Sequence, residues 1–350
     1  MTTAQEPRRD VRRNVEINVG KGCNGRCVFC LDGQVSAAQR APMEFDELAE
    51  EIRSWAARGH RSVGFLGGEP TIHPRLVDAV ALAREQGFTR IAIATNGRRL
   101  ADTAFADRLM DAGLTRVTVS MHGHTAALED RLAGVEGAYV QKVTALRHLR
   151  GRQDEGRLPD GVAVNMVLNA WNCEHLLRIQ RFFCQELGIP DLRINFIRAE
   201  GNAAGSRELT PRYRDAVRQL MKAVALNETY YRATLTFGGF PICVLPRSFR
   251  RDPDLVRRYV GEYRDMDTDC SIRSEGVNSP GHLSVVDGRA HFNWKERKRH
   301  DLKSPAAACG DCAATTLCEG VWNAYLEIYG DAEFKAVDGV LPEGGAVPEA

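Results

Sequence analysis

The stretch NVEINVGKGCNGRCVFC, residues 14–30, joins a short β-rich apolar run to a tight group of cysteines. The run 14–20 is typical of a strand. Cysteines follow it at once at positions 23, 27 and 30, separated by three and then by two residues, with no histidine nearby. Structural zinc prefers four ligands, usually as two pairs, whereas iron–sulfur clusters are held by closely spaced thiolates. Because three thiolates leave one iron open, the stretch predicts a metal site with a coordination position kept for another molecule.

Outward from this stretch, a strand, a loop and an amphipathic helix alternate six times up to residue 200. Apolar residues recur at helical spacing between the strands, as at Phe45, Leu48 and Ile52. Strands that alternate with helices pair in parallel, so we predict an α/β fold, either a partial barrel or an open doubly wound sheet. Both place their chemistry on loops at the C-terminal ends of the strands. The expected strands are 14–20, 62–66, 91–95, 116–120, 162–169 and 192–198.

Composition narrows the class of protein further. The chain has 350 residues, of which 43% are hydrophobic, which suffices for one large domain or for a medium and a small one. A formal net charge of +1 gives no indication of nucleic acid or of an anionic membrane. The sequence has neither the apolar run of a membrane helix nor that of a signal peptide, so we expect a cytoplasmic protein. Tight cysteine groups in a reducing compartment indicate metal or redox chemistry and not disulfides.

The strand–helix pattern ends after residue 200, and a second cysteine group follows. It comprises Cys309, Cys312 and Cys318, separated by two and then by five residues. Before it, Asp287-Gly288 stands between two alternating runs, which predicts a β-hairpin. A zinc knuckle is the structural alternative for this second group.

The first cysteine group carries a resemblance to a known family. Cys23-x3-Cys27-x2-Cys30, with Phe29 before the last cysteine, resembles the signature of the radical S-adenosylmethionine (SAM) enzymes. The resemblance implies a partial (β/α)6 TIM-like barrel and a [4Fe-4S] cluster whose open iron binds SAM. It further implies that an electron from a flavodoxin- or ferredoxin-type donor cleaves SAM to a 5′-deoxyadenosyl radical, which abstracts a hydrogen atom from the substrate.

Further landmarks fall where this family would place SAM contacts. Gly67-Gly68-Glu69-Pro70 follows the second expected strand and matches the family's motif for the SAM ammonium group. Glycines let a backbone approach a ligand closely, and Glu69 would supply negative charge beside a cation. By the same resemblance, the remaining candidates for SAM binding are Phe29 (toward the adenine), Asn96, Ser120 and Asn165.

The second cysteine group resembles the auxiliary-cluster region of SPASM and twitch-type radical SAM enzymes. That resemblance implies a small C-terminal α+β domain with one auxiliary [4Fe-4S] cluster. Its fourth ligand is Cys243 or Cys270, and we favour Cys243 because a proline-flanked cysteine recurs before such modules in similar sequences. Cys270 then becomes a candidate hydrogen-atom donor to a substrate radical, with a buried thiol as the simpler interpretation. The expected division is an N-terminal extension (1–13), a radical SAM barrel (14–205), a linker helix (206–231), an auxiliary-cluster domain (232–336) and a flexible tail (337–350).

These observations leave the substrate and the net reaction open among oxidation, epimerisation and bond cleavage. Peptide-modifying members often carry a recognition domain before the barrel, whereas thirteen residues precede the first strand here. We therefore expect a small-molecule substrate, such as a sugar, a nucleoside or an amino-acid-derived metabolite. One alternative is the maturation of a ribosomally made peptide. Another is a zinc or iron–sulfur electron-transfer or regulatory protein without SAM chemistry, which leaves the run from Gly67 to Pro70 unexplained.

Overall fold

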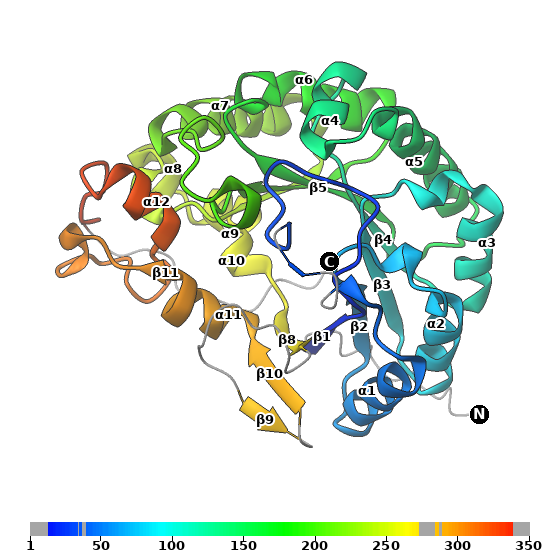
Figure 1. Ribbon diagram of the computed structural model, residues 1–350. Coiled ribbons are helices and arrows are strands. Elements are labelled where there is room, and N and C mark those ends of the chain that lie inside the picture. Colours follow the sequence, from blue (N-terminus) through cyan, green and yellow to red (C-terminus); the bar gives the residue numbers. More distant parts are fainter. Residues whose placement is uncertain (1–12, 34, 37–39, 273–283, 287–288, 339–350) are drawn as a thin grey trace, which may run out of the picture.

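The computed structural model describes residues 13–33, 35–36, 40–272, 284–286 and 289–338. Ten strands form one sheet in the order β7-β6-β5-β4-β3-β2-β1-β8-β10-β9, curved as Figure 1 shows. Neighbours from β7 through β1 to β8 pair in parallel, and β10 pairs antiparallel with both β8 and β9. The strands are β1 (Arg13–Asn18), β2 (Ser62–Leu66), β3 (Arg90–Thr95), β4 (Arg116–Ser120), β5 (Val162–Leu168), β6 (Asp191–Phe196), β7 (Thr234–Gly238), β8 (Asp267–Ile272), β9 (Ser284–Val286) and β10 (Arg289–Asn293).

Helices cover the outer face of this sheet, in the arc that Figure 1 shows. They are α1 (Phe45–Ala57), α2 (Leu76–Glu85), α3 (Thr103–Ala112), α4 (Ala126–Ala133), α5 (Ala138–Asp154), α6 (Leu176–Arg181) and α7 (Tyr213–Leu226). In α1 the helical spacing buries Leu48, Ile52 and Trp55 against the sheet. The six expected strand–helix units are all present, which confirms the α/β partial-barrel fold.

Shorter elements complete the C-terminal part and the connections. The short helices are α8 (Arg247–Arg250), α9 (Pro253–Tyr259), α10 (Gly261–Arg264), α11 (Trp294–Arg297) and α12 (Asn323–Tyr329), and β11 (Lys303–Ser304) pairs with β12 (Val321–Trp322). Single 3₁₀ turns are η2 (Pro70–Ile72), η3 (Arg99–Ala101), η4 (Cys173–His175), η6 (Gly201–Ala203), η8 (Ile242–Val244) and η10 (Ala307–Cys309). Single π turns are η5 (Phe182–Glu186), η7 (Asn227–Tyr231) and η9 (Lys298–Leu302). No described helix has both the length and the apolar character needed to cross a membrane.

The alternation of residues along β1 explains where the core and the interior lie. Val15 and Ile17 are fully buried in the hydrophobic core, whereas Asn14 and Glu16 line a cavity inside the barrel. Because successive side chains of a strand point to opposite faces, the first pair packs toward the helices and the second faces the interior. The interior of this barrel is therefore partly polar.

The segment 232–336 extends the barrel sheet at both edges. Its β7 adds a further parallel strand beside β6, and its β8 pairs in parallel with β1. Strands β9 and β10 pair antiparallel, as the hairpin prediction requires, while its turn, residues 287–288, lies outside the described residues. The N-terminal extension up to residue 12 and residues 339–350 of the expected tail also lie outside them.

Candidate functional site

The first three cysteines lie on one loop, residues 20–33, which we call the cysteine loop; it follows β1 directly. All three side chains are half-buried. The Sγ of Cys23 accepts a hydrogen bond from the Gly25 N–H at 3.2 Å. Burial raises the pKa of each thiol, that of Cys27 to about 11. A set of partly buried thiols that share one loop fits the thiolate ligands that an iron–sulfur cluster takes.

Two backbone segments hold the cysteine loop in place. On one side, the N–H groups of Arg26 and Val28 donate to the carbonyls of Ala133 and Leu132 at the end of α4, at 3.0 and 3.1 Å. On the other side, Asn202 donates through its amide side chain to the Cys27 carbonyl and through its backbone N–H to the Cys30 carbonyl, both at 3.0 Å. The loop is thereby fixed between the fourth and sixth strand–helix units.

The glycine run after β2 packs directly against the cysteine loop. The N–H groups of Gly68 and Glu69 donate to the carbonyls of Gly20 and Gly22, each at 2.8 Å. A Cβ atom at Gly68 would lie 2.2 Å from the Gly22 carbonyl oxygen, so only glycine permits this approach. The close backbone approach expected of these glycines is therefore made, at least in part, toward the protein's own loop.

Glu69 is buried, and its carboxylate is hydrogen-bonded within the protein. One oxygen accepts from the Thr71 N–H at 3.0 Å and from the hydroxyls of Thr71 and Thr95 at 2.5 Å each. The other oxygen accepts from the Asn96 N–H at 2.6 Å. Glu69 thus ties the loop after β2 to the end of β3, and its contact with a SAM cation stays a prediction.

Of the other expected SAM contacts, Asn96 follows β3 and Ser120 ends β4, whereas Asn165 lies within β5. The Asn96 amide donates to the Asn24 side-chain oxygen of the cysteine loop at 2.6 Å. Ser120 and Asn165 are register partners on β4 and β5. The Asn165 side-chain oxygen accepts from the Asn195 amide at 2.6 Å. Asn96 therefore contacts the cysteine loop directly, and Ser120 and Asn165 lie side by side on the next two strands.

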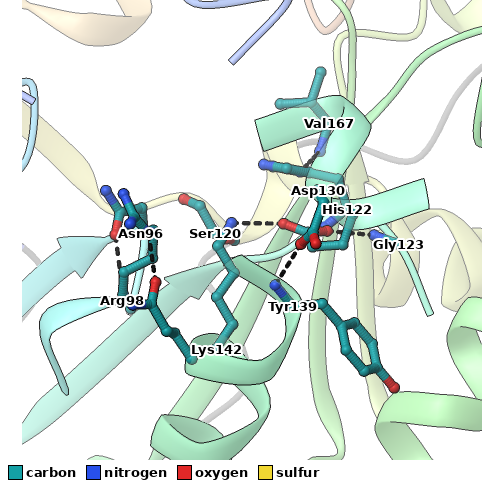
Figure 2. A network of polar contacts seen from close by, with 12 residues as sticks. Asn96, Arg98, Ser120, His122, Gly123, Asp130, Tyr139, Lys142 and Val167 are labelled. Atoms are coloured by element: carbon teal, nitrogen blue, oxygen red, sulfur yellow. Dashed lines mark hydrogen bonds and ion pairs between the residues drawn. The ribbon is translucent and has the colours of Figure 1, made fainter. Parts of the chain in front are cut away.

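Beneath the cysteine loop lies a buried ion pair that sequence reasoning missed. The Lys142 ammonium, whose polar contacts are drawn in Figure 2, lies 2.6 Å from a Glu129 oxygen. The two side chains are 1% and 0% exposed. The other Glu129 oxygen accepts from the N–H groups of His122 and Gly123 at 2.7 Å each. Lys142 also donates to the Ser120 carbonyl at 2.9 Å. Although burial opposes ionisation, the Lys142 charge holds the pKa of Glu129 below its usual value.

His122 connects this ion pair to the cysteine loop. Burial lowers the pKa of His122 to about 4, so the ring is neutral, and its Nδ1 accepts from the Val167 N–H at 3.1 Å. The ring of Phe29 stands edge-on to the His122 ring at a centroid distance of 4.8 Å. Phe29 is thereby positioned by a neutral histidine.

A cavity of about 430 Å³, which we call the central cavity, occupies the interior of the barrel. Phe29 and Leu31 of the cysteine loop form part of its wall, and Trp322 of β12 forms another part. Charged side chains of both signs line it: Glu16, Arg193, Arg198, Glu262, Asp265 and Lys298. The Asp265 carboxylate forms an ion pair with the Arg193 guanidinium. The central cavity thus connects the cysteine loop to the C-terminal part of the chain.

The second cysteine group surrounds a separate cavity of about 280 Å³, which we call the cysteine cavity. It is lined by Cys309, Cys312 and Cys318 and also by Cys243, which follows β7. Burial raises the pKa of Cys243 to about 11. Among the described residues no three His, Cys, Asp or Glu side chains lie close enough to share a single metal ion. Four thiols around a cavity fit a four-iron cluster, which spreads its ligands over four metal atoms.

Cys270, the other candidate for the fourth ligand, lies elsewhere. It is buried on β8 beside Glu16, with its Sγ 3.8 Å from a Glu16 carboxylate oxygen. Burial, and then the negative charge of Glu16, raise the pKa of Cys270 well above its usual value, so the thiol keeps its proton. The structure therefore groups Cys243, and not Cys270, with the three C-terminal cysteines.

Comparisons with known proteins agree with this geometry. The sequence profile of the Radical SAM superfamily matches residues 17–181. A probable GTP 3′,8-cyclase of Metallosphaera sedula is 29% identical over 231 residues, which are 64% of this chain and 68% of the cyclase. An AdoMet-dependent heme synthase of Methanosarcina barkeri is 26% identical over 317 residues, 85% of this chain and 88% of the synthase. Against other GTP 3′,8-cyclases the chain spans only 41% or 42% of their length.

Among solved structures, native anSMEcpe with bound AdoMet superimposes with a TM-score of 0.59 and covers 93% of both chains. Its sequence is 14% identical, so the likeness concerns the fold alone.

Proposed function

Residues 17–181 of this chain belong to the radical SAM superfamily, and from this premise we propose that the protein is an enzyme that removes a hydrogen atom from a small molecule bound in the central cavity. The cofactors of the family are a [4Fe-4S] cluster and SAM, which when bound supply a 5′-deoxyadenosyl radical that takes a hydrogen atom from carbon. In this proposal Cys23, Cys27 and Cys30 hold that cluster.

One observation carries the proposal. The cysteine loop that presents the three thiols also contributes Phe29 and Leu31 to the wall of the central cavity. A reactive group held by the neighbouring thiols would therefore lie next to this cavity. The volume of about 430 Å³ lies within the range of sites that enclose small molecules.

The remaining residues of the strand ends would position SAM. Gly67 and Gly68 pack against the backbone of the cysteine loop, and Glu69 binds both this loop and the end of β3. Pro70 completes the run in this proposal. Asn96, Ser120 and Asn165 would offer polar groups to SAM along the same end of the sheet, and Phe29 would contact its adenine. A flavodoxin- or ferredoxin-type protein would deliver the electron.

The C-terminal cysteines would hold a second, auxiliary [4Fe-4S] cluster. Cys243, Cys309, Cys312 and Cys318 provide four thiols around one cavity, which supports complete ligation by the protein. Among the residues that the structure describes, none lines both the cysteine cavity and the central cavity. This separation favours electron transfer over direct substrate binding as the role of the auxiliary cluster.

Cys270 remains a candidate hydrogen-atom donor. Its thiol keeps its proton, as such a donor requires, and its neighbour Glu16 lines the central cavity. Cys270 itself does not line that cavity, so donation would need a small rotation of the Glu16 side chain. The iron content of Cys243→Ala and Cys270→Ala tests which of the two cysteines is the fourth ligand of the auxiliary cluster. We expect a loss of about four irons per chain in Cys243→Ala and none in Cys270→Ala.

Anaerobic reconstitution tests the proposed function. We expect about eight irons per chain and release of 5′-deoxyadenosine that depends on dithionite. Deuterium transfer from a labelled candidate into 5′-deoxyadenosine then identifies the substrate. If deuterium is transferred only from a peptide encoded beside this gene, the substrate is a peptide and not a small molecule. Tightly held zinc without SAM cleavage would instead make the chain a metal protein without radical chemistry.

A further inference from the structure

The Trp322 end of the central cavity contains a buried donor without an acceptor. The Nε1 of Trp322 is buried and has no hydrogen-bond partner among the described residues. A buried N–H without an acceptor costs free energy, and such groups are rare in native proteins. A Cβ atom at Gly239 would lie 2.9 Å from this Nε1, so the glycine leaves the indole N–H uncovered.

A second donor lies beside it. The Nε of Arg198 is buried and lies 2.9 Å from a Glu200 oxygen in an ion pair. The Arg198 guanidinium carbon is 5.8 Å from the centre of the Trp322 ring. Burial lowers the pKa of Arg198 although the charge of Glu200 opposes this shift, so a further anion placed here would stabilise the charged form of Arg198.

The same wall also holds an acceptor without a donor. One Glu262 oxygen is buried without a hydrogen-bond partner among the described residues, while the other accepts from the Gly239 N–H at 3.2 Å. Glu262 and Trp322 therefore flank the same glycine. Lys303 lies near both, 3.9 Å from a Glu262 oxygen and 4.6 Å from the centre of the Trp322 ring.

We propose that this end of the central cavity binds the α-amino acid group of the substrate, with the carboxylate on Arg198 and Trp322 and the ammonium group on Glu262. Trp322, Arg198 and Glu262 all line the central cavity, and their side chains match a ligand with an anionic and a cationic group on neighbouring atoms. The inference rests on the proposed function and narrows its substrate class to an amino acid or a derivative that keeps this group. The remainder of the substrate would extend toward Phe29, where the hydrogen atom is removed.

Isothermal titration calorimetry of the anaerobically reconstituted enzyme with SAM tests the proposal. Each of the twenty common L-amino acids is titrated at constant ionic strength, and the tightest ligand is compared with its decarboxylated amine and its deaminated acid. We expect the amine and the acid to bind at least about tenfold more weakly, since each loses one charged hydrogen-bonded group.

Two variants give a crossed pattern that a merely structural role would not produce. Trp322→Phe keeps the ring and removes the N–H, so it should weaken the amino acid and the acid about tenfold and leave the amine unchanged. Glu262→Gln should weaken the amino acid and the amine and spare the acid. Trp171→Phe, which removes an indole N–H that binds Glu208 outside the cavity, is the matched control.

Absence of saturable binding by any amino acid, or an equal effect of either variant on all three ligands, would overturn the assignment. SAM cleavage measured on the same samples separates the two levels of inference. If the parent protein cleaves SAM but binds no amino acid, only the substrate class is wrong. If the parent protein does not cleave SAM, the proposed function is refuted.

Discussion

Replacement of Lys142 by methionine should strongly destabilise the chain, because it leaves a carboxylate buried without its cation. Lys142 and Glu129 are 1% and 0% exposed and 2.6 Å apart, so solvent screens neither charge. Removing one partner of a buried ion pair costs about 3–5 kcal/mol. In the double variant Lys142→Met, Glu129→Gln the neutral amide oxygen still accepts from His122 and Gly123. We expect the free energy of unfolding of that variant to lie within about 1–2 kcal/mol of the parent's, because a neutral replacement of both partners leaves no uncompensated charge.

The pH dependence of this loss has a definite sign. In the parent, the pKa of Glu129 lies below its usual value of 4.5, so its contribution to stability is complete above that value and disappears as the pH falls through the lowered pKa. In Lys142→Met, burial without a cation raises the pKa of Glu129 above its unfolded value. The difference in the free energy of unfolding between the parent and the variant should therefore be largest near about pH 8 and become smaller toward about pH 5.

Urea unfolding of the metal-free, reduced chain, followed by circular dichroism, measures both effects. Arg181→Met is the control, because it breaks an exposed ion pair with Glu186 and should cost less than about 1 kcal/mol. A loss below about 1 kcal/mol in Lys142→Met, or a double variant no more stable than the single one, would refute the reasoning.

Three further predictions concern the two cysteine groups, the glycine run and His122. Cys27→Ala should abolish release of 5′-deoxyadenosine, measured by chromatography, whereas Cys312→Ala should retain some; equal and total loss in both would argue against separate roles for the two cysteine groups. Gly68→Ala places a Cβ atom 2.2 Å from the Gly22 carbonyl oxygen and should reduce iron incorporation at the cysteine loop, while Gly151→Ala, whose Cβ atom meets nothing within 4 Å, should not. His122 has a pKa of about 4 in the folded chain against 6.5 ordinarily, so the folded state binds fewer protons and stability should fall by about 3 kcal/mol as the pH drops from 6.5 to 4. His122→Gln should flatten that part of the urea-unfolding profile, and an unchanged slope would contradict the assignment.

The barrel could be predicted from the sequence because the pattern that indicates it is local. Each strand–helix unit repeats the same alternation of apolar residues, and the cysteine loop follows β1 without a gap. The added strands β7 and β8 were not predicted, since β8 (DTDCSI) carries few apolar residues and pairs with a strand from the other end of the chain. Strand pairing of this kind depends on tertiary contacts that no local pattern reports.

The choice between Cys243 and Cys270 as the fourth ligand likewise depends on tertiary contacts. Distance along the chain does not separate Cys243 from Cys270, because loop closure depends only weakly on loop length. Only the folded chain places Cys243 in the cysteine cavity and Cys270 beside Glu16. No local pattern indicated that Lys142 and Glu129 form a buried ion pair, since charged residues within helices usually face solvent.

The pairing of β8 with β1 has a consequence for biosynthesis. β1 leaves the ribosome well before β8, yet the two strands pair in the finished sheet, with Glu16 opposite Cys270, 254 positions later. Until that late segment emerges, one side of the first strand exposes unpaired amides and carbonyls, a surface that invites aggregation. Nascent or truncated chains that stop before Asp267 should therefore depend on chaperones.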